Sequence, residues 1–312
     1  MPSSRDVLTP DSLAMLQAIA ETGSFAAAAR SLGLVPSALT YRVRQIEDAL
    51  DVLLFDRRSR HAQPTAAGQA LLQEGARLLQ EIDAVAHRVK RVATGWEPQL
   101  TIVVDGAIAR TPIFELIEAF YALKSPTRLK LKEAILSGTL ETLTSGQADL
   151  AIGIAVNASN AAELQTREIG EADFIFAVAP HHPLAQAREP ISDKELLQHR
   201  VIAVADSGVR SNISYGLIDG QDVLTVDSMQ AKVEAQVRGI GCGFLPRGMV
   251  QAYLDAGLLV TRQVERARRT LRVHYAWSGA PQHTPGRALQ WWLEQLESPT
   301  TRRALMENHQ RH

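Results

Sequence analysis

The spacing of apolar residues predicts three helices before residue 50. The first starts at Thr9-Pro10, because threonine caps a helix and proline fits its first turn. The second follows Ser24, whose hydroxyl can cap it, and ends in a turn at Gly33. The third opens at Pro36. Its apolar residues share one face at spacings of four, three and four: Leu39, Val43, Ile46 and Leu50.

The opposite face of the third helix carries hydroxyls and charged groups: Ser37, Thr40, Tyr41, Arg44 and Asp48. Two helices joined by a tight turn, with such a face on the second, are typical of a recognition helix that lies in a DNA major groove. An ordinary amphipathic hairpin with a solvated polar face has the same pattern. This window alone favours neither interpretation over the other.

A basic segment follows the helices. It lies between the apolar run Leu53-Leu54-Phe55 and Gln63-Pro64-Thr65. Its basic residues are Arg57, Arg58, Arg60 and His61. We expect a short β-ribbon here, a wing that holds these side chains along DNA phosphates.

A long helix is predicted from Thr65, which can cap it, to the break at Gly95-Trp96-Glu97-Pro98. Its apolar positions recur at alternate steps of four and three: Leu71, Gly75, Leu78, Ile82, Val85, Val89 and Val92. A mean period of about 3.5 residues favours a coiled-coil seam, and therefore a dimerisation helix. The alternative is a long surface helix packed on its own domain.

Beyond residue 96 strands alternate with helices, which predicts an α/β fold of parallel sheets with helices on both faces. The expected strands cover 100–104, 129–132, 149–154, 201–204, 224–228, 241–245 and 271–277, and a second unit begins near 174–180. The expected helices cover 111–123, the segment that ends near Ser145, 192–197, 228–238 and 285–297. We expect the strand at 271–277 to return to the first unit, so that two α/β units flank a cleft.

Ligands of open α/β sheets bind at the carboxyl ends of strands, beside helix N-termini. The residues at these positions are Asp105, Gly106, Ala107, Ile108, Arg110, Glu133, Ile154, Asp206, Ser207, Asp227 and Ser228. Small residues and hydroxyls there let a ligand approach backbone amides. Each residue taken singly is also explained as an ordinary loop or capping residue.

Composition limits the remaining possibilities. The 312-residue chain is 46% hydrophobic, enough for two or three packed domains. Its net charge of −1 confines phosphate contact to the basic segment. The single cysteine, Cys242, excludes an internal disulfide and lies among small and apolar residues, as a buried filler does. We find no signal peptide or membrane span, so we expect a cytoplasmic protein.

No motif indicates catalysis. The chain has no P-loop, no dinucleotide-binding glycine pattern, no nucleophile elbow and no zinc-binding His-Glu-x-x-His. His181 and His182 are adjacent but have no partner at a ligand spacing, which favours a turn over a metal site. We expect a binding module without cofactor or metal. A hydrolase or transferase fused to a DNA-binding head is the alternative.

Together these motifs resemble the LysR-type transcriptional regulators over essentially the whole chain. The segments that carry the resemblance are Gly23-Ser24-Phe25, Ala27-Ala28-Ala29, Leu32, Ser37 to Thr40, Ile46-Glu47, Leu50, Leu54 to Arg57, Thr65 to Gly68, Gly146 to Ile152, His182-Pro183-Leu184 and Gly239 to Pro246. Val35 to Tyr41, with Gly95-Trp96-Glu97 and Leu100 to Val103, resembles a subgroup of regulators of purine, allantoin and aromatic-compound metabolism.

The resemblance implies a winged helix-turn-helix, a dimerising linker helix and a two-lobed effector domain like a periplasmic binding protein. It also implies a homotetramer that binds double-stranded promoter DNA, bends it and contacts RNA polymerase. The DNA-binding residues carried over by position are Ser24, Pro36, Ser37, Thr40, Tyr41, Arg44, Arg57, Arg58 and Arg60. At Pro36 the chain departs from the family, where many members have a glutamine that often contacts a base edge.

The domain boundaries follow from these assignments. The DNA-binding domain covers 1–64, the dimerisation helix 65–95 and the effector domain 96–312. One effector lobe takes about 97–166 and 273–300, and the other about 167–272. The resemblance implies a small, polar, nitrogen-containing effector. The alternative function is a ligand-independent architectural DNA-binding protein whose α/β part serves only assembly.

Overall fold

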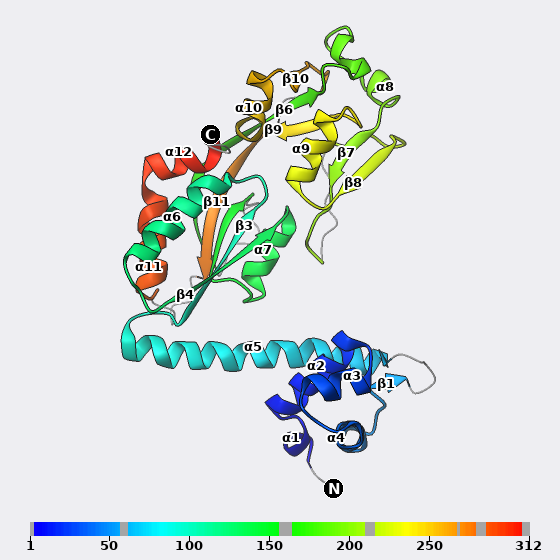
Figure 1. Ribbon diagram of the computed structural model, residues 1–312, viewed down its shortest axis with the longest axis vertical. Coiled ribbons are helices and arrows are strands. Elements are labelled where there is room, and N and C mark those ends of the chain that lie inside the picture. Colours follow the sequence, from blue (N-terminus) through cyan, green and yellow to red (C-terminus); the bar gives the residue numbers. More distant parts are fainter. Residues whose placement is uncertain are drawn as a thin grey trace. The chain divides into compact units, whose positions relative to one another are not determined.

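The computed structural model describes residues 3–56, 62–155, 164–209, 216–266, 269–278 and 285–307. The chain divides into two compact units, Met1–Val89 and Lys90–His312 (Figure 1). The first unit holds the predicted helical head, and the second holds the α/β lobes.

The head contains the three predicted helices, which are confirmed, and one short helix that was not predicted. They are α1 (Ser4–Val7), α2 (Pro10–Thr22), α3 (Phe25–Ser31) and α4 (Pro36–Leu50). The unpredicted α1 is held by a capping box between Ser3 and Asp6. The other starts are capped as expected: Thr9 Oγ1 accepts the Ser12 N–H at 3.2 Å and Ser24 Oγ accepts the Ala27 N–H at 3.4 Å.

The apolar face of α4 forms the core of the head. Leu39, Val43 and Ile46 are buried there against α2, and Leu50 packs at the margin. Ala28 and Ala29 of α3 are buried too, which lets the helices approach closely. Gly33 forms the turn before α4 with φ of +67°, a conformation that glycine adopts without strain.

The predicted ribbon is confirmed as an antiparallel pair, β1 (Phe55–Asp56) and β2 (Gln63–Pro64). The ring of Phe55 meets that of Phe25 edge to face, with centroids 5.5 Å apart, and so fixes the ribbon to α3. Arg57, Arg58, Arg60 and His61 lie outside the described residues.

The long helix α5 (Ala66–Thr94) agrees with the prediction to within one residue at each end. Thr65 Oγ1 caps it by accepting the Gly68 N–H at 3.0 Å. A β-carbon at Gly68 would lie 2.0 Å from the carbonyl oxygen of Leu54, the residue before β1, so only glycine lets α5 pack against the backbone there. Gly75 likewise lies against Leu13, where a β-carbon would come within 3.0 Å of Leu13 Cδ2.

Lobe I is a sheet covered by helices on both faces (Figure 1). Its parallel strands are β4 (Arg128–Ala134), β3 (Gln99–Asp105) and β5 (Leu150–Ile154). Leu100 and Ile102 pack on one face and Val103 on the other, as expected for a strand buried on both sides. The helices of the first face are α6 (Arg110–Ala122), α11 (Arg287–Glu297) and α12 (Pro299–Glu307), and that of the second is α7 (Ser137–Thr144).

Two long strands cross between the lobes, β6 (Leu164–Val178) and β11 (Arg269–Ser278). β11 pairs with β5, which confirms the expected return to the first unit. The prediction of a parallel sheet is confirmed for β3, β4 and β5 but is wrong for the rest of this sheet, because β6, β9, β10 and β11 pair antiparallel. Parallel neighbours in a sheet need a crossover connection, usually a helix. β11 has no such connection to β5, because the chain enters lobe I directly from lobe II, and the two strands run antiparallel.

Lobe II continues from the end of β6, which pairs with β9 (Gly243–Pro246) and β10 (Val260–Thr261). A parallel pair, β7 (Val201–Val204) and β8 (Val223–Val226), adjoins β9 through a bridge from Val201 to Cys242. The helices are α8 (Asp193–Leu196), α9 (Met229–Val237) and the unpredicted α10 (Arg247–Asp255). Cys242 is fully buried, and burial raises the pKa of its thiol to about 12, so the thiol stays protonated.

Candidate DNA interface and effector cleft

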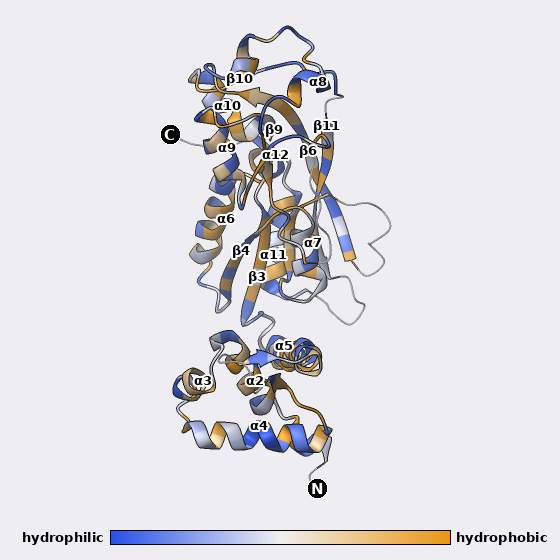
Figure 2. Cartoon of the chain, turned by 90° about the vertical axis from the view of Figure 1, so that its right-hand side faces the viewer, coloured by the Kyte–Doolittle hydropathy of each residue, from blue (hydrophilic) through white to orange (hydrophobic). Residues whose placement is uncertain are grey.

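The solvent-facing side of α4 carries the residues predicted to touch DNA. Figure 2 shows polar and apolar residues interspersed along this helix, as an amphipathic helix requires. Pro36, Ser37, Tyr41 and Arg44 are exposed. Thr40 is half-buried, and its hydroxyl donates to the Pro36 carbonyl at 2.9 Å.

The side chains of Tyr41 and Arg44 both keep hydrogen-bond donors that a ligand could use. The Tyr41 hydroxyl accepts a hydrogen bond from Gln45 Nε2 at 3.2 Å, which leaves its own proton available. The Arg44 guanidinium has no partner in the described part of the chain, so all its donors face solvent. Ser24 differs from both, because its hydroxyl is already used as the cap of α3.

In the second unit, hydrogen bonds join the two lobes directly. Asp206, after β7, accepts the backbone N–H of Ser137 at 3.1 Å and the Ser137 hydroxyl at 2.7 Å. The neighbouring Ser207 hydroxyl accepts the Ile135 N–H at 2.8 Å. A β-carbon at Gly138 would lie 2.1 Å from Ser207 Oγ, so glycine there allows the loops to meet. We call residues 135–138 and 206–208 the interlobe loops.

Asp105 organises the lobe I side of these loops. Its carboxylate accepts the Ala107 N–H at 2.9 Å, the Leu136 N–H at 3.0 Å and the Thr139 hydroxyl at 3.1 Å. Leu136 has φ of +56°, a strained conformation for a non-glycine residue, and the bond to Asp105 helps to hold it. Burial raises the pKa of the Asp105 carboxyl to about 6, and the three donors oppose that rise.

The other predicted cleft residues differ in their surroundings. Gly106 lies next to the interlobe contact, because a β-carbon there would approach Glu133 Oε1 and Met229 Cγ at 3.4 Å. Ile108 and Ile154 are buried in lobe I, behind the loops. Ser228 caps α9 by accepting the Ala231 N–H at 3.2 Å, and Asp227 is exposed. Arg110 forms an ion pair with Glu133.

Sequence reasoning missed the start of α7 as part of this region. Ser137 and Thr139 bond to Asp206 and Asp105, and Glu141 accepts the Val209 N–H at 2.8 Å. The pattern Leu136-Ser137-Gly138-Thr139, with hydroxyls at a helix N-terminus after a strand, could have indicated it.

His182, one of the two adjacent histidines that could suggest a metal site, has a structural role. His182 Nδ1 accepts the Leu184 N–H at 3.2 Å and so caps a short turn after β6. Among the described residues, no three His, Cys, Asp or Glu side chains are grouped to hold a metal. No helix within the described ranges is long and apolar enough to cross a membrane.

A helix-turn-helix head joined to a two-lobed α/β unit defines a transcriptional regulator that responds to a ligand. The head matches the model of the bacterial regulatory helix-turn-helix proteins of the lysR family over residues 10–69. The second unit matches the LysR substrate binding domain over residues 93–299. The chain belongs to the LysR family of transcriptional regulators.

Relatives support this assignment over more than nine-tenths of the chain, and solved structures share its fold. The chain is 36% identical over 287 residues to the HTH-type regulator YeeY of Escherichia coli (strain K12), covering 92% of each protein. It is 34% identical over 290 residues to the probable regulator YhaJ of the same organism, covering 93% of this chain and 96% of YhaJ. The fold is similar to full-length CbnR complexed with its target DNA, with a TM-score of 0.60 at 19% identity, covering 92% and 98% of the chains.

A second similar fold is that of LysG from Corynebacterium glutamicum with the bound effector Arg. Its TM-score is 0.52 at 21% identity, covering 96% of this chain and 99% of LysG. The chain is thus a DNA-binding transcriptional regulator whose promoter binding is modulated by a small-molecule effector.

Proposed function

We propose that the chain binds promoter DNA as a homodimer joined through α5, and that two dimers assemble into a homotetramer. The seam predicted along α5 supports this proposal. Ile82, Val85 and Val89 are 47, 48 and 66% exposed, and they follow one another at steps of three and four. A contiguous apolar stripe is costly in water, and a second α5 helix would cover it.

Dimerisation explains how the head reads DNA. Two α4 helices reach successive major grooves when their half-sites lie about one helical turn, roughly 34–36 Å, apart. We assign base and backbone contacts to Ser37, Thr40, Tyr41 and Arg44, and positioning at the helix ends to Ser24 and Pro36. We assign phosphate contacts to Arg57, Arg58 and Arg60, because cationic side chains in a ribbon can follow the sugar–phosphate backbone.

The interlobe loops are the proposed effector site. Asp206 and Ser207 bond across to Ile135 and Ser137, so a polar ligand between the lobes must replace or bridge these bonds. Such a ligand changes the lobe geometry and thereby the DNA bend and the contact with RNA polymerase. A coupling of about 1–3 kcal/mol between effector and DNA suffices for a useful response.

Asp105, Gly106, Ala107, Arg110, Glu133, Asp227 and Ser228 surround the loops, with Ile108 and Ile154 as apolar support. We propose a small, polar, nitrogen-containing effector, cytoplasmic location and no catalytic step. Arginine in LysG is an effector of this chemical kind.

Footprinting tests the proposal. The full chain would select its binding sites from a random DNA library, and the enriched DNA would be footprinted with and without purines, ureides, amino acids and aromatic acids. We expect two protected half-sites, and a pattern of enhanced cleavage that changes with one class of compound. A footprint that no compound alters would favour the ligand-independent architectural alternative. Turnover of a bound compound would point to an enzyme.

A further inference from the structure

The helix α4 begins without a side-chain cap, unlike α2, α3 and α5. Thr9, Ser24 and Thr65 cap those three helices by accepting a backbone N–H. The corresponding position of α4 is Val35, whose side chain cannot accept a hydrogen bond. Serine, threonine, aspartate and asparagine are the residues that stabilise a helix from this position. The stability of α4 therefore does not explain why a valine stands there.

The backbone around Val35 is fixed, and its side chain faces solvent. The Leu34 N–H donates to the Ala29 carbonyl at 2.8 Å, and the Leu34 side chain packs against the core of the head. The Val35 carbonyl accepts the N–H groups of Ala38 at 3.1 Å and Leu39 at 3.3 Å. The Val35 side chain is nevertheless 63% exposed. The fold thus presents this valine to solvent at the first turn of α4.

Val35 and the exposed Pro36 that follows it form an apolar surface, which we call the apolar tip of α4. Neither side chain donates or accepts a hydrogen bond, and Pro36 has no backbone N–H. Both side chains are stiff, because the branched β-carbon restricts the χ1 of valine and the ring restricts proline. A stiff surface loses little conformational entropy when a partner covers it.

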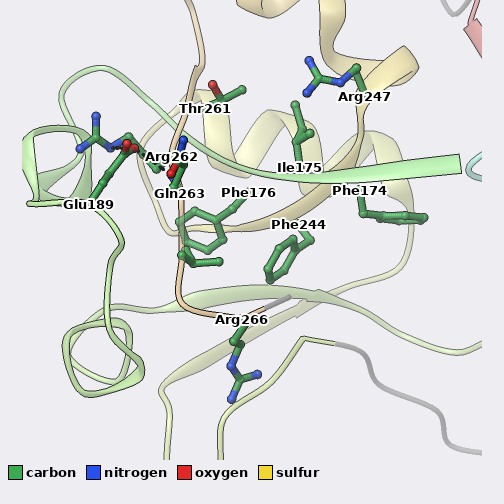
Figure 3. Close-up of a pocket in the computed structure, with 11 residues that line it drawn as sticks. Phe174, Ile175, Phe176, Glu189, Phe244, Arg247, Thr261, Arg262, Gln263 and Arg266 are labelled. Carbon is green, nitrogen blue, oxygen red and sulfur yellow. Dashed lines mark hydrogen bonds and ion pairs between the residues drawn. The ribbon is translucent and has the colours of Figure 1, made fainter. Parts of the chain in front are cut away.

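The side chains around a cavity of lobe II differ from the apolar tip, because they contact one another. Figure 3 shows this cavity of about 340 Å³, with Arg262 beside Glu189. Arg262 Nε lies 3.1 Å from Glu189 Oε1, and the ring of Phe244 meets that of Phe176 with centroids 5.4 Å apart. Val35, in contrast, belongs to none of the buried apolar clusters of the described residues.

The position of the apolar tip decides what it can contact on DNA. The residues at the N-terminus of a recognition helix are those that approach the base edges in the major groove. Most groups that base pairs present in this groove are hydrogen-bond donors or acceptors, and the C5-methyl group of thymine is the apolar one. An apolar side chain at the start of α4 therefore matches thymine.

We propose that the apolar tip of α4 recognises the C5-methyl group of a thymine in each half-site. Val35 makes the contact, and Pro36 extends the apolar surface beside it. This inference rests on the proposed function, which assigns base contacts to α4, and it adds an apolar determinant of sequence to the polar ones. Deoxyuridine in place of thymine removes only this methyl group and keeps every donor and acceptor of the base pair.

The test uses the full chain and the operator selected from the random DNA library. Each thymine of one half-site is replaced in turn by deoxyuridine, and affinity is measured by fluorescence anisotropy at one salt concentration. Val35→Ala shortens the apolar tip, and Val35→Ile keeps it. Val52→Ala is the matched control, because Val52 is also an exposed valine of the head, at 41%, but lies beyond the C-terminal end of α4.

We expect deoxyuridine at one position to weaken binding of the wild-type chain about fourfold, the effect of one buried methyl group. Val35→Ala should weaken binding to the unmodified operator by a similar factor. The same deoxyuridine should then cause no further loss, because the two changes remove one contact. Val35→Ile and Val52→Ala should respond to deoxyuridine as the wild-type chain does.

Three results would overturn the assignment: selected half-sites without thymine, wild-type binding that no deoxyuridine weakens, or a loss with deoxyuridine that is undiminished in Val35→Ala. If Arg44→Ala still relaxes the sequence preference in any of these cases, α4 remains the recognition helix and only the role of Val35 is rejected. If the variants of Val35 and Arg44 all keep wild-type affinity and sequence preference, the proposed role of α4 is rejected as well.

Discussion

Ser137 of lobe I donates both its backbone N–H and its hydroxyl to the carboxylate of Asp206 in lobe II, at 3.1 and 2.7 Å. The carboxylate therefore sits at the N-terminus of α7, where the helix dipole favours a negative charge. Hydrogen bonds to an ionised group are the stronger kind, so this pair helps to hold the two lobes together.

Asp206→Ala removes this connection. We expect the free energy of unfolding of the second unit to fall by about 2 kcal/mol, because Ser137 loses a charged acceptor. Urea unfolding followed by circular dichroism measures the change. Asp219→Ala is the control, since Asp219 is an exposed carboxylate of the same lobe. Equal stability of the two variants would contradict the role given to Asp206.

The raised pKa of Asp105 predicts that the free energy of unfolding depends on pH. Its pKa is raised by burial from 3.8 to about 6, so the folded chain holds this proton more tightly than the unfolded chain. Its contribution to stability is therefore complete below pH about 4 and is lost as the pH rises through about 6. The total change is about 3 kcal/mol, at 1.36 kcal/mol per pKa unit.

Asp105→Asn isolates that contribution, because asparagine does not titrate. The stability of the wild-type chain relative to the variant should fall between pH about 4 and about 7. Urea unfolding at steps of pH across this range measures the difference. A difference that stays constant with pH would show that Asp105 titrates normally.

The seam of α5 predicts the effect of a charge on association. Ile82→Lys places an ammonium on the apolar stripe of both helices of a dimer, where it is repelled and desolvated. We expect the dimer dissociation constant to rise at least tenfold in sedimentation equilibrium. Ala84→Lys adds the same charge to an exposed position on another face of α5 and should leave association unchanged. Equal association of both variants would exclude the seam.

The exposed position of Arg44 on α4 predicts that its removal reduces the preference for particular DNA sequences. If it contacts a base edge, Arg44→Ala should weaken operator binding by about 1–3 kcal/mol and relax the preference at one position of each half-site. Fluorescence anisotropy with the selected operator and its single-base variants measures both effects. Arg128→Ala, an exposed arginine on β4, is the control. A uniform loss across all sequences would instead assign Arg44 to phosphate.

The sequence predicted those elements whose patterns are local. Thr9, Ser24 and Thr65 cap their helices as expected, and the apolar spacing located α4 and α5 to within about one residue. Strands buried on both faces, such as β3, read as continuous apolar runs and were also found.

Elements that depend on distant partners were not predicted. The first part of β6 is mostly exposed or half-buried, so its sequence resembles a loop, and it becomes a strand by pairing with β11, about a hundred residues later. The close packing at Gly68 and Gly138 is invisible in sequence, because the opposing groups, Leu54 and Ser207, come from other elements. The same limit applies to the candidate site. Asp105, Asp206 and Ser207 were placed near the cleft, but their partners on α7 were not.

The most direct test of the central claim asks whether the effector acts through the interlobe loops. Operator affinity of the full chain would be measured by anisotropy with and without the compound that alters its footprint, in wild type and in Ser207→Trp. We expect Ser207→Trp to bind the operator as tightly as wild type but to show no response to the compound, because tryptophan cannot fit against Gly138. An undiminished response in Ser207→Trp would contradict the account and place the effector elsewhere in the chain.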